Sequence, residues 1–215
     1  MKFKIEVKNL QKKYNNAIIF RDINLCIETP KCFGISGQNG AGKSTLIKIL
    51  SGLLSPTKGD ILYFKDDIII DKSHFIFYSS FAAPYASLYE EFSLWETLEI
   101  FAKIKKIRLD IKLAQKYIDI FSLKRKSLEP LKNFSSGMIQ RAKLIVAFSM
   151  QPKILFFDEP ASNLDDAAKQ IAREIIFDYA KENIVIIASN ESEDLVLCSS
   201  LINLDESNNI IKASS

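Results

Sequence analysis

The feature that most constrains this sequence is an eight-residue segment, GQNGAGKS at residues 37–44, between two stretches of different pattern. Residues 32–36 before it are apolar and are predicted as a buried strand. After it, residues 46–50 carry apolar side chains at helical spacing, and Gly52 would end this short helix from a left-handed position. A strand, a glycine-rich loop and a helix in this order predict a βα unit, with the loop at the carboxyl end of the strand.

The residue types in this loop match the pattern Gly-x-x-x-x-Gly-Lys-Ser/Thr, which binds phosphate. The glycines can take torsions that turn successive backbone amides inward, and the following helix adds a positive partial charge. The Lys43 ammonium could neutralise the β- and γ-phosphates of a nucleotide, and the Ser44 hydroxyl could bind Mg²⁺. A flexible turn before a helix would explain the glycines, but it would explain neither the lysine nor the hydroxyl.

Two carboxylates, Asp158 and Glu159, directly follow an apolar run at residues 154–157, which is predicted as a central parallel strand covered on both faces. Carboxylates at the end of a buried strand are costly unless a cation lies close to them. Mg²⁺ held by Asp158, Ser44 and the phosphates would supply that charge. Glu159 would then face the γ-phosphate and orient or deprotonate the attacking water. The alternative is a strand that ends in a solvated acidic turn.

The rest of the chain predicts an α/β fold in a single domain over residues 1–215, because the sequence contains no repeats, low-complexity tracts or linker-like runs. Its N-terminal part is rich in apolar and β-branched residues, which favours strands. Later, a strand, an amphipathic helix and a second buried strand imply a right-handed parallel βαβ unit. The strands expected, besides 32–36 and 154–157, are residues 3–7, 17–20, 24–28 and 184–187.

A helical insertion is expected at about residues 85–150, between the N-terminal strands and the strand that carries the acidic pair. Apolar residues recur there at helical spacing, and serines at the start of the third helix can cap its free amides. The helices expected are residues 94–102, 111–121 and 136–150 within the insertion, and 166–181 after it.

Composition excludes several classes of protein. With 47% hydrophobic and 26% charged residues, the chain of 215 residues is an ordinary globular sequence, and its net charge of +3 does not favour nucleic acid as a partner. No apolar stretch approaches the ~20 residues of a membrane span, and the first residues lack the apolar core of a signal peptide. A cytoplasmic protein is therefore expected. Cys26, Cys32 and Cys198 all lie in apolar segments and are expected to be buried free thiols.

Further segments resemble the motifs of ABC ATPases, in the order and spacing of that family. Residues 133–141 (NFSSGMIQR) look like its signature motif, in a Ser-Ser-Gly variant, shortly before the acidic strand. Residues 161–165 (ASNLD) resemble its D-loop, and residues 52–60 (GLLSPTKGD) resemble its connection out of the first helix. Tyr14 stands where the family has an aromatic ring that stacks on adenine. The similarity covers nearly the whole chain.

The resemblance implies a P-loop NTPase core with a parallel sheet, an N-terminal antiparallel β part and a helical insertion. It also implies ATP and Mg²⁺ as cofactors. It implies a head-to-tail dimer, of the chain with itself or with a paralogue, in which ATP lies between the phosphate loop of one copy and the signature of the other. The chain would hydrolyse ATP to power a separate membrane permease, with an exporter favoured, from the cytoplasmic face of the cell membrane.

Each expected site residue has an assigned role. The residues assigned to ATP binding are Tyr14, Gly37, Gln38, Asn39, Gly40, Ala41, Gly42, Lys43, Ser44 and Thr45. Catalysis is assigned to Glu159, Lys43 and Asn190, and the metal to Ser44 and Asp158. The residues expected to act in trans are Ser135, Ser136, Gly137 and Met138 of the signature, and the D-loop contributes Ser162 and Asp165. The serines and the glycine of the signature start a helix, whose free amides can meet a γ-phosphate.

Two positions depart from the family pattern. A histidine is expected after the last core strand, where this chain has Asn190, which can hydrogen-bond a phosphate or a water but cannot carry the charge of an imidazolium. The only histidine, His74, lies in another part of the chain. The family also has a glutamine before the helical insertion, and residues 79–85 (SSFAAPY) contain none.

Two alternatives stay open beside the transporter subunit. The departures leave room for a nucleotide-binding regulatory module with little turnover. The family also includes soluble ATPases that act on nucleic acid or ribosomes, although the sequence lacks the long coiled-coil insertion and the second ATPase unit usual in that class.

Overall fold

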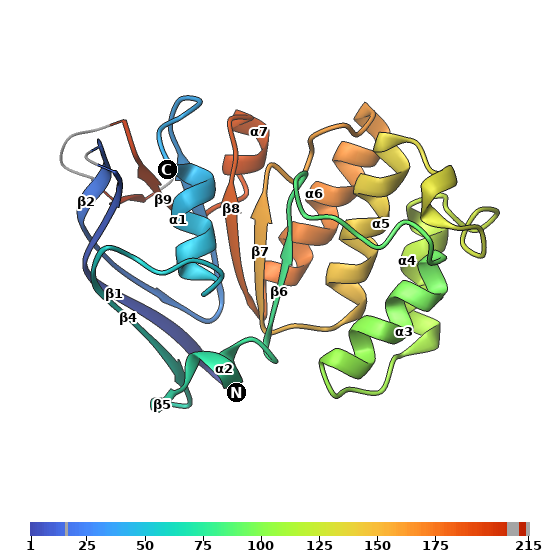
Figure 1. The fold of residues 1–215 in the computed structure, drawn as a ribbon, viewed down its shortest axis with the longest axis horizontal. Coiled ribbons are helices and arrows are strands. Elements are labelled where there is room, and N and C mark those ends of the chain that lie inside the picture. The colour runs from blue at the N-terminus through green and yellow to red at the C-terminus, as the bar shows by residue number, and fades with distance from the viewer. Residues whose placement is uncertain (16, 206–210, 214–215) are drawn as a thin grey trace.

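The chain folds around two β-sheets, and the structure, a computed structural model, describes residues 1–15, 17–205 and 211–213 (Figure 1). Among these residues, four strands form an antiparallel sheet in the order β2-β1-β4-β5, and six form a second sheet in the order β10-β9-β3-β8-β7-β6. The first sheet comprises β1 Phe3–Tyr14, β2 Ala17–Glu28, β4 Lys58–Lys65 and β5 Ile68–Ile70. The second comprises β3 Lys31–Ser36, β6 Ser79–Ala82, β7 Ile154–Asp158, β8 Ile184–Ala188, β9 Ser200–Asn203 and β10 Ile211–Ala213.

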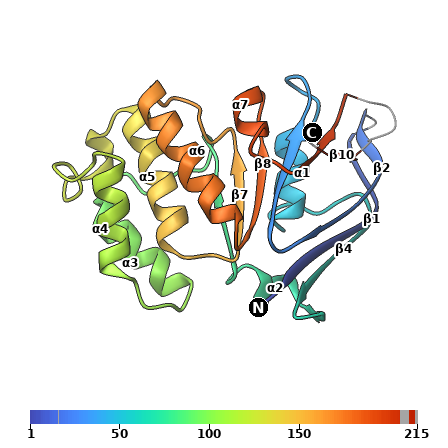
Figure 2. The same cartoon turned by 180° about the vertical axis from the view of Figure 1, so that it is seen from behind.

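Helices cover both faces of the second sheet (Figures 1 and 2). Because successive side chains of a strand point to opposite faces, β7 contributes to two cores: Phe156 packs with α1, and Phe157 packs with α5 and α6. In the described part of the chain, none of the helices combines the length and the apolar character needed to cross a membrane. The helices are α1 Lys43–Leu50, α2 Lys72–Phe75, α3 Leu94–Ile104, α4 Ile111–Ile120, α5 Ser136–Ser149, α6 Asp166–Ala180 and α7 Ser192–Leu195, with a short 3₁₀ helix at Leu131–Asn133.

The register of the second sheet decides where the loops after its strands meet. β3, β8, β7 and β6 are parallel neighbours, so their carboxyl ends lie along one edge. Ile35 of β3 is aligned with Ala188 of β8, and Ala188 is aligned with Asp158 of β7. The loops that leave these three strands therefore start side by side.

The structure confirms the α/β class, the parallel core and the antiparallel N-terminal strands. The helices expected at 94–102, 111–121, 136–150 and 166–181 match α3, α4, α5 and α6, with ends that differ by two residues at most. The sequence patterns miss β4, β5, β6, β9 and β10. Four of these strands have only three or four residues, and β4 is half-buried, so none gives a strong periodic signal. The division of the chain into domains stays a prediction.

The three cysteines do not share one environment. Cys32 and Cys198 are buried, with their sulfur atoms 3.1 Å apart, whereas Cys26 is exposed. The expectation of three buried thiols is therefore wrong for Cys26, because side chains alternate along β2 and Leu25 and Ile27 face the core. The contact with Cys198, together with burial, raises the pKa of the Cys32 thiol, so Cys32 stays protonated at neutral pH.

Phe156 tests the packing around β7. None of its surface is exposed, and it shares a core with α1 and with the antiparallel sheet. Replacing Phe156 with alanine should lower the free energy of unfolding by about 3–5 kcal/mol, through lost burial and the cavity left behind. Urea denaturation measures this loss. The control is Leu128→Ala, at a side chain that is 78% exposed, where the change should stay within about 0.5 kcal/mol. Equal losses in the two variants would contradict this packing.

Candidate active site at the carboxyl edge of the parallel sheet

Three segments meet at the carboxyl edge of the second sheet, each from one of three neighbouring strands (Figure 1). The loop at residues 37–44 follows β3, the acidic pair lies at the end of β7, and Asn190 comes two residues after β8. Hydrogen bonds join the three segments, because Lys43 donates to the Asn190 side chain and the Asn190 backbone amide donates to Glu159. The residues that the sequence patterns assign to catalysis thus form one cluster.

The loop at residues 37–44 turns tightly before α1 begins. Gly37, Gly40 and Gly42 have φ angles of 143°, 88° and 102°, which side chains rarely allow. Gly42 also has no room for a side chain, since a Cβ there would lie 2.5 Å from Cγ2 of Ile19. Backbone conformation and close packing therefore both require glycine in this loop.

The Lys43 ammonium lies against this loop, and only 6% of the residue is exposed. It donates to the carbonyl oxygens of Gly37 at 2.8 Å and Gln38 at 3.2 Å, and to the side-chain oxygen of Asn190. The side-chain NH₂ of Asn190 donates in turn to Oδ1 of Asn39 at 2.6 Å. Asn190 therefore contacts the loop through both ends of its amide.

Asp158 is buried at the end of β7, with 1% of its surface exposed. Its Oδ2 accepts a hydrogen bond of 2.6 Å from the Tyr85 hydroxyl, whereas Oδ1 is buried and has no hydrogen-bond partner among the described residues. A buried carboxylate oxygen without a donor is costly, and a cation removes that cost. Ser44 and Thr45 lie in the first turn of the neighbouring α1, so oxygen ligands suited to Mg²⁺ are present on two adjacent elements.

Glu159 turns back towards the segment after β8. Its backbone has a φ angle of 48°, and its Oε2 accepts from the Ser189 hydroxyl at 3.2 Å and from the Asn190 amide at 3.3 Å. Partial burial raises the pKa of Glu159 above its ordinary value, and the charge of Asp158 acts in the same direction. The two hydrogen bonds and the Lys43 ammonium lower this pKa. A carboxylate with a raised pKa beside a phosphate-binding loop is suited to accept a proton from water.

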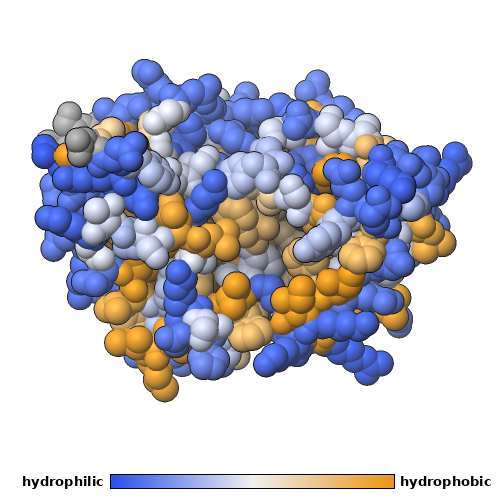
Figure 3. Space-filling model, viewed as in Figure 1, coloured by the Kyte–Doolittle hydropathy of each residue, from blue (hydrophilic) through white to orange (hydrophobic). Residues whose placement is uncertain are grey.

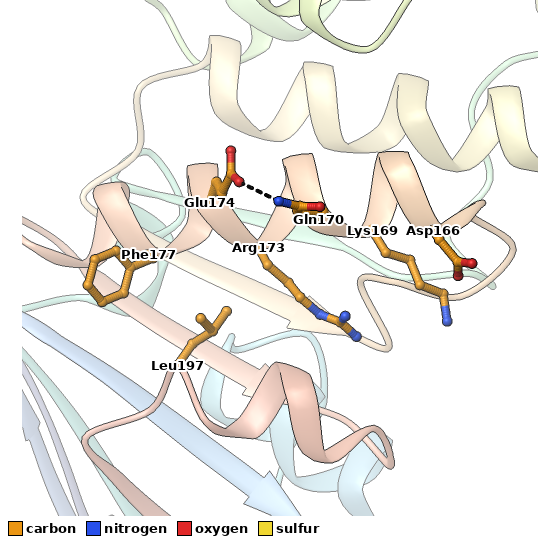
Figure 4. Close-up of a pocket in the computed structure, with 7 residues that line it drawn as sticks. All are labelled: Asp166, Lys169, Gln170, Arg173, Glu174, Phe177 and Leu197. Carbon is orange, nitrogen blue, oxygen red and sulfur yellow. Dashed lines mark hydrogen bonds between the residues drawn. The ribbon is translucent and has the colours of Figure 1, made fainter.

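Ion pairs connect this part of the site to α6. The Ser189 hydroxyl lies 2.8 Å from Oδ2 of Asp194, and the other oxygen of Asp194 accepts from Nε of Arg173 at 2.7 Å. Arg173 also pairs with Glu191 at 2.7 Å. Arg173 lines a hollow of about 500 Å³. Figure 4 shows its side chain extending from α6. Because these hydrogen bonds are charge-assisted, they hold in place the segment that carries Ser189 and Asn190.

The signature segment forms the start of α5. The Ser135 hydroxyl caps the helix by accepting from the Met138 amide at 3.3 Å, and Ser136 is the first helical residue. A Cβ at Gly137 would lie 2.8 Å from the backbone oxygen of Asn163, so the signature packs closely on the expected D-loop. α5 and α1 pack on opposite faces of the second sheet, which separates the signature from the phosphate loop of the same chain.

The remaining expected residues lie around this cluster. Asp165 caps α6 by accepting from the Ala168 amide at 2.8 Å, and it pairs with Arg141 of α5. The Ser162 hydroxyl is buried and has no hydrogen-bond partner within the described ranges. Tyr14 lies at the end of β1 with 47% of its surface exposed, so its ring has a face on which a base could stack.

Sequence reasoning missed three residues of the site: Tyr85, Ser189 and Arg173. A signal existed for Tyr85, which ends the segment in which the family's glutamine is missing. Ser189 directly precedes Asn190 and could have been noticed for its hydroxyl. Arg173 gave no signal, because its partner Asp194 lies 21 residues away on another element.

Comparison with known proteins decides the family. The family model described as ABC transporter matches residues 20–162, which include the phosphate loop, the signature and the acidic pair. The chain belongs to the ABC transporter family. It is an ATP-binding subunit of the ABC transporter type and an ATPase.

Two curated relatives are similar to the chain over most of their length. The lantibiotic transport ATP-binding protein SrtF of Streptococcus pyogenes is 30% identical over 190 residues, which are 86% of this chain and 79% of the relative. The uncharacterized ABC transporter ATP-binding protein YybJ of Bacillus subtilis is 31% identical over 200 residues, which are 90% and 89% of the two chains.

Solved structures of ABC proteins share the fold. The cassette MJ0796, solved as a dimer bound to ADP and Pi, gives a TM-score of 0.83 at 19% identity, over 97% of this chain and 98% of that one. An ATP-binding subunit of an ABC transporter gives 0.81 at 24% identity, over 93% and 85% of the two chains. These similarities confirm the P-loop NTPase fold class.

Removing the Ser189 hydroxyl should shift the acidic side of the pH–rate profile to higher pH. The hydrogen bond from Ser189 lowers the pKa of Glu159, so Ser189→Ala should raise that pKa further above its ordinary value. A base acts only when it is deprotonated, and the rate therefore falls as the pH drops through this pKa. Initial ATPase rates from acid to neutral pH measure the shift. Ser192→Ala is the control, because the Ser192 hydroxyl bonds to Glu193. A profile that Ser189→Ala leaves unchanged would contradict this role.

Proposed function

We propose that this chain hydrolyses ATP with Glu159 as the base, as one half of a head-to-tail dimer that powers a separate membrane permease. The observation that carries the proposal is the meeting of Lys43, Asn190 and Glu159 at one edge of the parallel sheet. The family supports ATP as the nucleotide. The following paragraphs give the part of each group.

The phosphate loop supplies most of the contacts for the nucleotide. Its backbone amides and the N-terminus of α1 bind the phosphate oxygens, and Lys43 neutralises their charge. Ser44 and Asp158 hold Mg²⁺, which when bound withdraws charge from the phosphates. The unpartnered Oδ1 of Asp158 supports this assignment. Tyr14 offers its exposed ring to the adenine.

Glu159 orients the attacking water and accepts its proton. Its raised pKa brings this carboxylate closer to the range in which proton transfer is effective. Asn190 hydrogen-bonds the γ-phosphate or the water in place of the family's histidine, and it supplies no charge. The Ser189 hydroxyl lies within hydrogen-bond distance of both Glu159 and Asp194 of α7, so Ser189 helps to fix the position of Glu159.

The signature acts on the nucleotide of a second copy or of a paralogue. α1 and α5 lie on opposite faces of the second sheet, so Ser135 and Gly137 are displayed away from the phosphate loop of their own chain. The free amides at the start of α5 are suited to a γ-phosphate. The dimeric state of the structurally similar cassette MJ0796 supports this arrangement.

A groove beside α3 is suited to the permease. It holds about 350 Å³ between the end of α1, β6, α3 and α5, and its lining is mainly apolar, with Leu53, Phe77, Phe101 and Ile104 among its residues. Figure 3 shows apolar side chains around a hollow in the middle of this face. Lys105 at its wall donates to two backbone carbonyls, and burial lowers the pKa of Lys105 to about 8. An amphipathic helix of a membrane protein could lie in such a groove.

Binding to a permease would place the chain in the cytoplasm, on the inner face of the cell membrane. The Ser-Ser-Gly signature leads us to propose export, and SrtF is named for lantibiotic transport. The spermidine/putrescine import protein PotA of Fusobacterium nucleatum is 28% identical over 196 residues. Because PotA is named for import and SrtF only for transport, the direction is decided by transport assays with the co-purified permease in vesicles.

Glu159→Gln should reduce ATP turnover by roughly 10²–10⁴-fold, because an amide cannot take the proton from water. Binding of ATP should remain, since Glu159 does not belong to the phosphate loop. Steady-state hydrolysis and equilibrium binding, each with Mg-ATP and the purified protein, measure the two effects. Equal turnover in wild type and Glu159→Gln would remove Glu159 from the mechanism.

A nucleotide-binding regulatory module with little turnover is the second candidate function, and it is favoured by Asn190 at the position where a histidine is expected. Lys43→Ala is the control that separates this candidate from an active ATPase. Wild-type hydrolysis that does not exceed the Lys43→Ala background, even with the native membrane partner, would favour the regulatory module.

The double variant Leu53→Asp/Ile104→Asp should lose the permease. These side chains are 56% and 61% exposed, so the fold should tolerate charges there, whereas an apolar partner should not. Purification from native membranes, followed by identification of the co-purified proteins, measures the loss. Leu128→Asp is the matched control, at a position 78% exposed and outside the groove. Undiminished recovery of the permease would contradict the docking site. Recovery of wild type with nucleic acid or ribosomes alone would favour the soluble class of ABC ATPase.

A further inference from the structure

A tyrosine contacts the carboxylate at the end of β7 from the segment that enters the helical insertion. Tyr85 lies between β6 and α3, and its hydroxyl donates to Oδ2 of Asp158 at 2.6 Å. The phenol carries the only proton available for this hydrogen bond, because an ionised carboxylate can only accept, so Tyr85 is the donor. Oδ1 of Asp158 is buried and has no partner in the described part of the chain. Tyr85 thus uses one oxygen of this carboxylate and leaves the other for a cation.

Contacts from three elements hold Tyr85 in this position. Lys48 of α1 lies over the ring, with its ammonium 3.8 Å from the ring centroid. Phe81 of β6 packs beside it, with the two ring centroids 6.4 Å apart. Lys143 of α5 donates to the two backbone carbonyls that directly precede Tyr85, at 3.1 and 2.5 Å. The tyrosine therefore connects α1, which follows the phosphate loop, and α5, which begins with the signature, to Asp158.

We propose that Tyr85 is a positioning residue for Mg²⁺, whose hydroxyl fixes the Asp158 carboxylate so that Oδ1 is available to the metal. This rests on the proposed function, in which Asp158 holds Mg²⁺. Tyr85 itself touches neither metal nor nucleotide and acts through Asp158. Because Lys143 anchors the backbone beside Tyr85, a shift of α5 would also move the tyrosine and would change the hold on the metal ligand.

The test is Tyr85→Phe, which removes only the hydroxyl. Mn²⁺ serves as the probe, and electron paramagnetic resonance measures its affinity for the full chain in the presence of a non-hydrolysable ATP analogue. The Mn²⁺ affinity should fall by roughly 10- to 100-fold, as is usual when a hydrogen bond to a metal ligand is lost. Binding of the analogue in EDTA should not change. Tyr89→Phe, in the same connection and 76% exposed, should retain the wild-type affinity for Mn²⁺.

Asp158→Asn distinguishes failure of this proposal from failure of the proposed function. Wild-type Mn²⁺ affinity in Asp158→Asn would overturn the metal role of Asp158, and the role of Tyr85 with it. Loss of Mn²⁺ in Asp158→Asn with wild-type affinity in Tyr85→Phe would overturn the role of Tyr85 alone. Loss of analogue binding in EDTA by Tyr85→Phe would assign the hydroxyl to the maintenance of the fold and would overturn the proposal as well.

Discussion

The parallel pairing of β3, β8 and β7 is the constraint on which the whole site depends. The register brings Ile35, Ala188 and Asp158 level at the carboxyl ends of the three strands. Because both faces of these strands are covered by helices or by the antiparallel sheet, polar groups that follow them gather at this edge. A slip of one residue in β7 would turn Asp158 to the opposite face of the sheet. The buried apolar side chains that fix the register therefore also fix the chemistry.

The site brings together charged groups that are costly to bury, and different contacts offset this cost for each of them. Lys43 is surrounded by backbone oxygens and by the side chain of Asn190. Glu159 accepts hydrogen bonds from Ser189 and Asn190, although partial burial still raises its pKa. Asp158 is compensated on one oxygen only. Because the other oxygen of Asp158 is buried without a hydrogen-bond donor among the residues that the structure describes, which is costly for a carboxylate, we expect a cation there.

Local patterns made several parts of the molecule predictable. The phosphate loop and the acidic pair each follow a strongly apolar strand, and the helices of the insertion have clear periodicity. These signals predicted the places of the loop, the pair and the helices in the fold, and the structure confirms them. Short strands such as β6 and β9 have too few residues for a period to emerge. Cys26 shows a different limit, because an apolar neighbourhood in the sequence does not say to which face of a strand a side chain points.

The sequence by itself determined the family motifs, their order and the α/β class, because these depend on residue types within a few positions of each other. Only the tertiary structure decided which polar groups meet. Tyr85 and Asp158 are 73 residues apart, and Lys43 and Asn190 are 147 apart. Such contacts depend on how strands and helices pack against each other, and they leave no local or periodic trace in the sequence. The role of the Tyr85 hydroxyl in positioning Asp158 became a testable proposal only when the fold placed the two side chains in contact.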